Sequence, residues 1–378
     1  MSITKELEKL AARMICAGFE GTVVPAEMDA LIDRGIGGAV FFARNVESPQ
    51  QFADLAARVK DRAGDRPFLT SIDQEGGRVQ RLKEPFTIIP PMRAVGEAND
   101  EALAEQIGRV LGRELRAVNI DMDLAPVLDV DTNAANPVIG ARSFGREVAL
   151  VSKLGCAVIR GLQAEGVAAC AKHFPGHGDT SQDSHLDLPK LPHALERLMS
   201  VEIPPFQAAI DAGVASIMSA HVIFEPIDSK YPATMSHAVL NGLLRQQLGF
   251  DGLIISDAMD MKAIAEHFGF VDGILRGAKA GIDFFMCCHS HAEQHQAIEL
   301  LVKAVESGDL PKSRLEESNA RLDRVAAQFV RPARRGSLPE NIGSEAHRRV
   351  ADRVKQAATA GSMVAGYDPT APERLLGK

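Results

Sequence analysis

Residues 166–189 read GVAACAKHFPGHGDTSQDSHLDLP, an apolar run followed by a long polar stretch. The first six residues have the short, continuous apolar pattern of a buried strand. Residues 172–189 hold three histidines, three aspartates and a lysine among glycines and prolines, a composition that suits neither a core strand nor a regular helix. The stretch therefore predicts a buried strand that ends in a loop presenting polar side chains.

The same order, an apolar run and then helical material, recurs along the chain. The predicted strands are residues 13–18, 37–42, 67–72, 121–128, 166–171, 215–220, 252–255 and 282–287. The predicted helices between them include residues 49–62, 100–118, 147–165, 194–212 and 237–248. This pattern of strands, each followed by helical material, indicates an α/β fold of the (β/α)8 TIM-barrel type. The alternative is a doubly wound open sheet, but no G-x-G-x-x-G motif follows the first strand.

The chain is expected to form a single domain with a short C-terminal extension. Residues 1–330 are assigned to the (β/α)8 catalytic barrel, whose ring is closed by a helix at residues 312–328. Beyond it, residues 331–343 have the basic, Pro- and Gly-containing composition of a linker, and residues 344–358 have a helical pattern. We therefore expect the extension, residues 331–378, to be partly helical, not an independent domain, and packed on the barrel or frayed.

The composition is that of an ordinary globular protein, with 46% hydrophobic and 24% charged residues among 378. The formal net charge of −8 argues against nucleic acid or an anionic membrane as a main partner. The chain has no Trp and two Tyr, so a bound sugar would be held mainly by hydrogen bonds and charged side chains.

The cysteines predict a reducing compartment. They are five in number, lie mostly inside apolar runs and lack C-x2-C spacing, which is typical of buried, reduced thiols. Residues 1–10 are charged and helical and lack the features of a signal peptide. No apolar stretch reaches the length needed to span a bilayer. We expect a cytoplasmic protein, with a monomer as the favoured oligomeric state.

Polar side chains stand where the predicted strands end. They are Asp73, Asp129, Lys172, His173, His221 and Asp257. In a parallel barrel the carboxyl ends of all strands open on one face, where active sites are built. These residues, scattered in the sequence, are therefore expected to converge.

Asp183 and His185 in the polar loop can form a catalytic dyad. An aspartate beside a histidine fixes the imidazole tautomer and raises its basicity, and an imidazole with a pKa of about 6.5 can give and take a proton near neutrality. One alternative is a solvated loop histidine. Another is a metal site made of Asp183, His173, His177 and His185. The metal site is disfavoured because the loop has no regular H-x3-H helix, and we expect no metal and no cofactor.

Asp257 follows the apolar run at residues 253–256 and allows two interpretations. A carboxylate at the end of a barrel strand can act as a nucleophile toward an oxocarbenium-like centre. The same residue could instead cap the following helix. The local sequence leaves both open.

Three further stretches carry groups suited to sugar hydroxyls. Asp73 and Arg81 lie in the first, Arg142 in the second, and Lys172 with His173 in the third. A carboxylate accepts hydroxyl hydrogen bonds, and an arginine offers a planar fork of donors. For each arginine, the alternative is a surface ion pair.

The polar loop resembles the K-H-F-P-G-H-G-x4-D-S-H-x3-P signature of family 3 glycoside hydrolases of the bacterial β-N-acetylglucosaminidase type. Ser256, Asp257 and Met261 match the S-D-x-x-x-M motif of the nucleophile in that family, although Ala258 stands where a second acidic residue is usual. The resemblance covers roughly residues 14–287.

This resemblance implies the roles of individual residues. Asp257 would be the nucleophile, His185 the general acid/base and Asp183 the residue that orients His185. The hydroxyls of the terminal sugar would be bound by Asp73, Arg81, Arg142, Lys172 and His173, with His221 as a further candidate.

By the same resemblance, the protein would be a retaining exo-glycosidase. It would remove terminal β-linked N-acetylglucosamine from peptidoglycan fragments during cell-wall recycling, with a saccharide as its partner and no cofactor. Two alternatives stay open. One is a phosphorylase that uses the same residues, because a neutral histidine tolerates an approaching phosphate. The other is a catalytically inactive, sugar-binding barrel.

Overall fold

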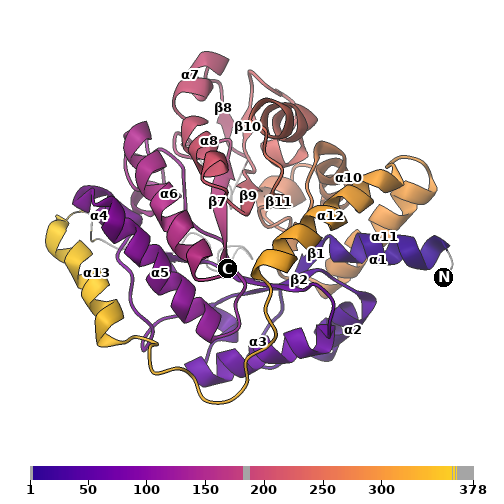
Figure 1. The fold of residues 1–378 in the computed structure, drawn as a ribbon. Coiled ribbons are helices and arrows are strands. Elements are labelled where there is room, and N and C mark those ends of the chain that lie inside the picture. The colour runs from indigo at the N-terminus through magenta and orange to yellow at the C-terminus, as the bar shows by residue number, and fades with distance from the viewer. Residues whose placement is uncertain (1–2, 182–187, 360, 362, 364–378) are drawn as a thin grey trace.

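The computed structural model describes residues 3–181, 188–359, 361 and 363. Parallel strands form one eight-stranded sheet that curls into a barrel, with helices around its outside (Figure 1). Their order around the barrel is β11 (Leu253–Ser256), β9 (Ser216–Ser219), β7 (Ala168–Phe174), β6 (Met122–Asp123), β3 (Leu69–Ile72), β2 (Gly38–Phe41), β1 (Ile15–Ala17) and β12 (Phe285–Cys287).

The barrel closes between β11 and β12. The backbone N–H groups of Asp283 and Phe284 both donate to the carbonyl of Ile254, over 2.9 and 3.2 Å, and Ile255 forms a parallel bridge to Phe284. Each of the predicted strand segments contains or overlaps one of these strands. The predicted (β/α)8 fold is therefore confirmed.

β7 and β6 end at other residues than predicted. β7 reaches Phe174, so Lys172 and His173 belong to the strand and not to the loop after it. β6 has only two residues, whereas the predicted run covers residues 121–128. Pro126 has no N–H to give to the ladder, which explains the early end of β6. Pairing resumes after the proline, where Val127 bridges to Lys172.

The helices surround the barrel. Those that match predicted segments closely are α3 (Pro49–Ala63), α5 (Glu101–Ala117), α6 (Val148–Ala164) and α12 (Lys312–Phe329). Further α-helices are α1 (Ile3–Arg13), α2 (Ala26–Arg34), α4 (Met92–Ala98), α9 (Lys262–Ala265), α10 (Phe270–Ala280) and α11 (His291–Glu306). Short 3₁₀ turns occur at η1 (Ala43–Asn45), η2 (Gly140–Arg142) and η3 (Ala233–Met235).

Two of the predicted helices need correction. The segment at residues 194–212 is divided into α7 (Leu195–Ser200) and α8 (Pro204–Asp211), because a proline cannot continue the preceding helix but suits the first turn of a new one. The segment at residues 237–248 forms a π-helix, η4 (Ala238–Gln247), and not an α-helix.

Two short ribbons follow strand ends. β4 (Gln74–Gly76) and β5 (Val79–Gln80) form an antiparallel hairpin directly after β3. Its turn requires glycine, because Gly76 and Gly77 have φ angles of 95° and 59°. β8 (Lys190–Leu191) pairs in parallel with β10 (Ile223–Phe224) after the polar loop.

Apolar side chains fill the barrel interior. Strand residues such as Val40, Leu69 and Met122 form one buried cluster, to which α12 adds Leu322 and Phe329. α12 therefore packs its apolar face into the interior cluster. All five cysteines are free and buried, as the sequence predicts.

The chain continues past α12 to one more helix, α13 (Glu345–Ala357), which is confirmed within a residue of its predicted ends. It packs against α4 and α5, on the opposite side of the barrel from α1 (Figure 1). Within the described part of the chain, no helix combines the length and apolarity that crossing a bilayer requires.

Asp283 joins three elements at the seam of the barrel, and its loss is expected to destabilise the fold. Its buried carboxylate accepts hydrogen bonds from Arg245 in η4, from the N–H of Ile254 in β11, and from Arg314 and Ser318 in α12. We expect Asp283→Ala to lower the free energy of unfolding by about 3–5 kcal/mol, because the substitution leaves buried cations unpaired. Urea denaturation measures this difference.

The matched control is Asp309→Ala, which removes an exposed ion pair with Lys279. It should cost less than about 1 kcal/mol. Equal effects of the two substitutions would contradict the role given to Asp283.

Candidate active site

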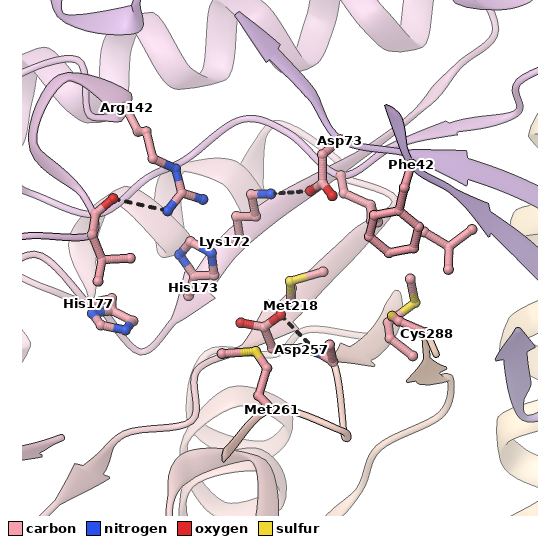
Figure 2. Close-up of a pocket in the computed structure, with 15 residues that line it drawn as sticks. Phe42, Asp73, Arg142, Lys172, His173, His177, Met218, Asp257, Met261 and Cys288 are labelled. Atoms are coloured by element: carbon pink, nitrogen blue, oxygen red, sulfur yellow. Dashed lines mark hydrogen bonds and ion pairs between the residues drawn. The ribbon is translucent and has the colours of Figure 1, made fainter. Parts of the chain in front are cut away.

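A pocket opens at the carboxyl ends of the barrel strands (Figure 2). Its described lining residues are Val40, Phe42, Asp73, Leu124, Val138, Arg142, Lys172, His173, His177, Met218, Asp257, Ala258, Met261, Met286 and Cys288. Five of the residues that the sequence predicts for the site are therefore brought together in one cavity.

One side of the pocket is a buried ion cluster, defined here as Asp73, Glu75, Arg142 and Lys172. Three of these residues line the pocket, and Glu75 binds two of them from outside the described lining. Lys172 Nζ lies 2.8 Å from Asp73 Oδ1 and 2.7 Å from Glu75 Oε1. Arg142 binds Glu75 with two hydrogen bonds, Nε to Oε2 and Nη2 to Oε1, each of 2.8 Å. The four side chains are 1–12% exposed, so they interact in a medium of low polarity.

The cluster fixes the charges of its members. Burial alone would raise the pKa of Glu75, but Arg142 and Lys172 outweigh it and hold that pKa well below its usual range. Burial likewise disfavours the charged form of Lys172, yet Asp73 and Glu75 raise its pKa above the ordinary value. Glu75 and Lys172 are therefore held in their charged forms.

Arg81 stands next to this cluster, outside the set of described residues that line the pocket. Its Nη2 lies 3.4 Å from Asp73 Oδ2, and its backbone N–H donates to Gln74 Oε1 over 2.9 Å. Its side chain is 3% exposed, which excludes the surface ion pair. Arg81 therefore supports Asp73 from within the protein.

Asp129 holds the histidine side of the pocket. Its Oδ2 lies 2.7 Å from Nδ1 of His173, and its Oδ1 accepts the backbone N–H groups of His173 and His177, over 3.1 and 2.7 Å. This contact fixes the orientation of the His173 ring. Burial lowers the pKa of His177 to about 4, with a further contribution from the charge of His173, so His177 is neutral at pH 7.

Asp257 is a wall residue of the pocket and not a helix cap. The next helix, α9, begins five residues later and has Met261 at its N-cap position. Asp257 Oδ1 accepts the N–H of Ala258 over 2.8 Å, and the partly exposed side chain points into the cavity across from Lys172 and Asp73 (Figure 2). The capping interpretation of Asp257 is therefore wrong.

The opposite wall is apolar and rich in sulfur. Met218, Met261 and Cys288 lie across from Lys172 and Asp73, and Phe42 and Met286 also line the pocket (Figure 2). Burial raises the pKa of the Cys288 thiol far above its usual value, so the group is neutral and contributes apolar surface. The pocket thus has the ion cluster on one side and, across from it, the Asp257 carboxylate surrounded by mostly apolar side chains.

Two predicted catalytic residues, Asp183 and His185, lie outside the residues that the structure describes. The start of their loop is anchored, because Asn136 Nδ2 donates to the carbonyl of His177 over 2.8 Å and Thr180 Oγ1 lies 2.7 Å from His177 Nδ1. Among the described residues, no three His, Cys, Asp or Glu side chains are placed to hold a metal ion. The metal alternative also needs Asp183 and His185, so it stays untested.

His221 is not among the described residues that line the pocket. Its Nδ1 lies 2.8 Å from Thr234 Oγ1, and its Nε2 lies 2.9 Å from the carbonyl of Ala258. These contacts are those of a hydrogen-bonded histidine at a strand end. Through Ala258, His221 contacts the backbone beside Asp257.

Sequence reasoning gave no role to Glu75 and named Asp129 only as a polar strand end. Glu75 is a buried carboxylate in β4 that faces Arg142 and Lys172, residues far along the chain. The available signal was weak: two carboxylates, Asp73 and Glu75, at a spacing that places them on the same side of an extended chain.

A parallel barrel with a carboxylate facing a buried, charged hydrogen-bonding wall has the layout of a glycosidase. The glycosyl hydrolase family 3 N-terminal domain matches residues 6–325. The chain belongs to this family, as its loop motif predicts.

Named relatives agree with this assignment. A β-hexosaminidase of Thiobacillus denitrificans is 41% identical over 279 residues, which are 72% of this chain and 76% of that protein. β-Hexosaminidase A of Pseudoalteromonas piscicida is 32% identical over 365 residues, 89% of this chain, which spans 61% of its length.

Solved structures are similar as well. A family 3 β-N-acetylglucosaminidase from a Paenibacillus species has a TM-score of 0.90 and 38% identity, covering 95% of this chain and 69% of that one. NagZ from Neisseria gonorrhoeae, bound to N-trifluoroacetyl-D-glucosamine, has a TM-score of 0.75 and 30% identity, covering 92% and 98%.

The low pKa of Glu75 predicts a pH-dependent contribution to stability. Because the folded-state pKa lies below the unfolded value of about 4.3, Glu75 stabilises the fold above that pH, and the contribution is lost as the pH falls. The difference in unfolding free energy between wild type and Glu75→Gln should therefore shrink between pH 7 and pH 3. Urea denaturation at a series of pH values measures it.

Glu299→Gln is the control, because that carboxylate is exposed and lies 3.9 Å from Arg34. It should change stability little at any of these pH values. A difference for Glu75→Gln that stays constant with pH would contradict the charge assigned to Glu75.

Proposed function

We propose that this glycoside hydrolase is a retaining, exo-acting β-N-acetylglucosaminidase that removes terminal, non-reducing β-linked N-acetylglucosamine. The similarity of this chain to a β-hexosaminidase and to a family 3 β-N-acetylglucosaminidase supports an enzyme of the β-N-acetylhexosaminidase type. The observation that carries the proposal is the Asp257 carboxylate, which faces the ion cluster across a single pocket.

The ion cluster would bind the hydroxyls of the terminal sugar. Asp73 offers acceptors, whereas Arg142, Lys172 and His173 offer donors. Charge-assisted hydrogen bonds are the stronger kind, and these groups are already held in place by Glu75 and Asp129. Arg81 would act through Asp73. A prearranged site of this kind needs little reorganisation when substrate binds.

The apolar wall suits the acetamido group. Its methyl group would gain by leaving water for the surface of Met218, Met261 and Cys288. Binding of an N-acyl glucosamine by the gonococcal NagZ agrees with an acetamido sugar here. The wall would therefore favour N-acetylglucosamine over glucose.

The reaction would proceed in two displacements. Asp257 attacks the anomeric carbon while His185, oriented by Asp183, gives its proton to the leaving oxygen, so that the glycosidic bond breaks and a glycosyl ester forms. His185 then takes a proton from water, which attacks the same carbon and releases the sugar with its configuration retained. The roles of Asp183 and His185 are assigned from the resemblance of the sequence motif to that of the family.

The substrates proposed are peptidoglycan fragments in which N-acetylglucosamine is linked to anhydro-N-acetylmuramic acid. A place in cell-wall recycling and a cytoplasmic location belong to the same proposal. They rest on the resemblance to NagZ-type enzymes and on the five free cysteines.

The first test is turnover of p-nitrophenyl N-acetyl-β-glucosaminide beside the plain β-glucoside, with and without phosphate. We expect preferential release from the acetamido sugar, with free N-acetylglucosamine in both buffers. Sugar 1-phosphate as the product would make the protein a phosphorylase. Binding without turnover would indicate an inactive, sugar-binding barrel.

The loss of activity on substitution of the proposed acid/base should depend on the leaving group of the substrate. We expect His185→Ala to lower kcat/KM by about 10²–10⁴-fold for substrates with sugar leaving groups, and by much less for the activated aryl glycoside. His237→Ala is the matched control, because His237 is exposed. Equal losses on both substrates would count against an acid role for His185.

Asp257→Gly tests the nucleophile. Turnover should fall close to the detection limit, because no glycosyl ester can form. Azide should then restore reaction in the small space left by the carboxylate and give an azide of inverted configuration, which NMR identifies. Substantial activity without azide would remove Asp257 from the mechanism.

A further inference from the structure

A continuous series of hydrogen bonds joins helix α13 to the β4–β5 hairpin, which carries Glu75. α13 lies beyond residues 6–325, which match the family domain. Its residue His347 is 5% exposed, and its ring Nδ1 lies 2.8 Å from Oε1 of Glu114 in α5. α13 buries His347 together with Ala351 and Val354, and a polar ring in a buried face needs a hydrogen-bond partner.

Glu114 collects contacts from two segments. From the extension, it accepts the N–H of Gly343 over 2.9 Å in addition to His347. From the loop after the β4–β5 hairpin, it accepts the N–H and the hydroxyl of Thr87, over 2.9 and 2.6 Å. Burial alone would raise the pKa of Glu114, but the hydrogen bonds, that of His347 first, lower it, so the group is a carboxylate.

Thr87 connects Glu114 to the hairpin. Its carbonyl accepts a hydrogen bond from Gln80 Nε2 over 3.2 Å, and Gln80 Oε1 accepts the N–H of Ile89 over 3.1 Å. The carbonyl of Ile89 in turn accepts the N–H of Gly77, at the hairpin turn, over 2.8 Å. Gln80 and Thr87 are 5% and 2% exposed, so water does not compete for these bonds.

The hairpin carries Glu75, the carboxylate that binds Arg142 and Lys172 in the pocket wall. The extension also packs tightly on the intervening loop: a Cβ added to Gly343 would meet the carbonyl oxygen of Pro85 at 1.8 Å. Hydrogen bonds of 2.6–3.2 Å thus connect His347 to the hairpin, and Glu75 lies in the first strand of that hairpin, β4.

We propose that α13 positions the sugar-binding wall, with His347 and Glu114 as positioning residues that act through Thr87 and Gln80 on the hairpin of Glu75. The proposal rests on the proposed function, because it takes the ion cluster to be the sugar-binding wall. Loss of the His347 contact would leave the Gly343 N–H as the one remaining contact described here between the extension and Glu114, so Glu114 and Thr87 would be held less firmly. The hairpin could then shift by a few tenths of an ångström, enough to misplace charged groups that bind hydroxyls.

The test compares three variants of the full chain. His347→Ala removes the donor, His347→Asn restores a donor near the position of Nδ1, and Arg349→Ala is the control on the exposed face of α13. We expect His347→Ala to raise KM for p-nitrophenyl N-acetyl-β-glucosaminide by roughly 2- to 30-fold, the range of couplings through packed networks. His347→Asn should recover most of the loss, and Arg349→Ala should behave as wild type.

The assay temperature is set well below the unfolding midpoint of each variant, determined by circular dichroism, so that all are fully folded. A purely structural role would lower that midpoint and leave KM and kcat unchanged, and this result would overturn the proposal. If His347→Ala does not fold, Gln80→Ala replaces it with the same expectation. No turnover by the wild type would instead contradict the proposed function.

Discussion

The pocket depends on one buried carboxylate, Glu75, which neutralises two cations at once. Arg142 and Lys172 come from different parts of the chain, and both direct their charge at this group. Without it, two positive charges would remain close together in a medium that solvates them poorly. The hairpin after β3 exists, in functional terms, to bring Glu75 to that point, and its turn requires glycines because of their positive φ angles.

The charged wall and the apolar wall follow from how the barrel is built. Strand ends supply Asp73, Lys172, His173 and Asp257, whose polar groups converge because all strands run in the same direction. Sulfur-containing side chains from β9 and β12 complete the cavity without adding charge. The chain has no tryptophan, and residues of other types form both the charged and the apolar surface of the pocket.

Strands, fold and most of the site could be read from the sequence because they depend on local patterns. Each apolar run became a barrel strand, and strand ends then placed four predicted residues around one pocket, where Arg142 joins them from η2. What could not be read depends on contacts between distant residues. The bonds of Glu75 to Arg142 and of Asp129 to His173 leave no local signal, and Pro126 and Pro204 shortened elements whose periodicity suggested greater length.

The central claim is that Asp257 becomes glycosylated during turnover. The direct measurement is mass spectrometry of the protein after reaction with a slowly hydrolysed, fluorinated N-acetylglucosaminyl fluoride. One added glycosyl unit, located by peptide mapping on Asp257, is the predicted result. A label on another residue, or turnover with retention and no label at all, would contradict the account, because the acetamido group or a different side chain would then be the nucleophile.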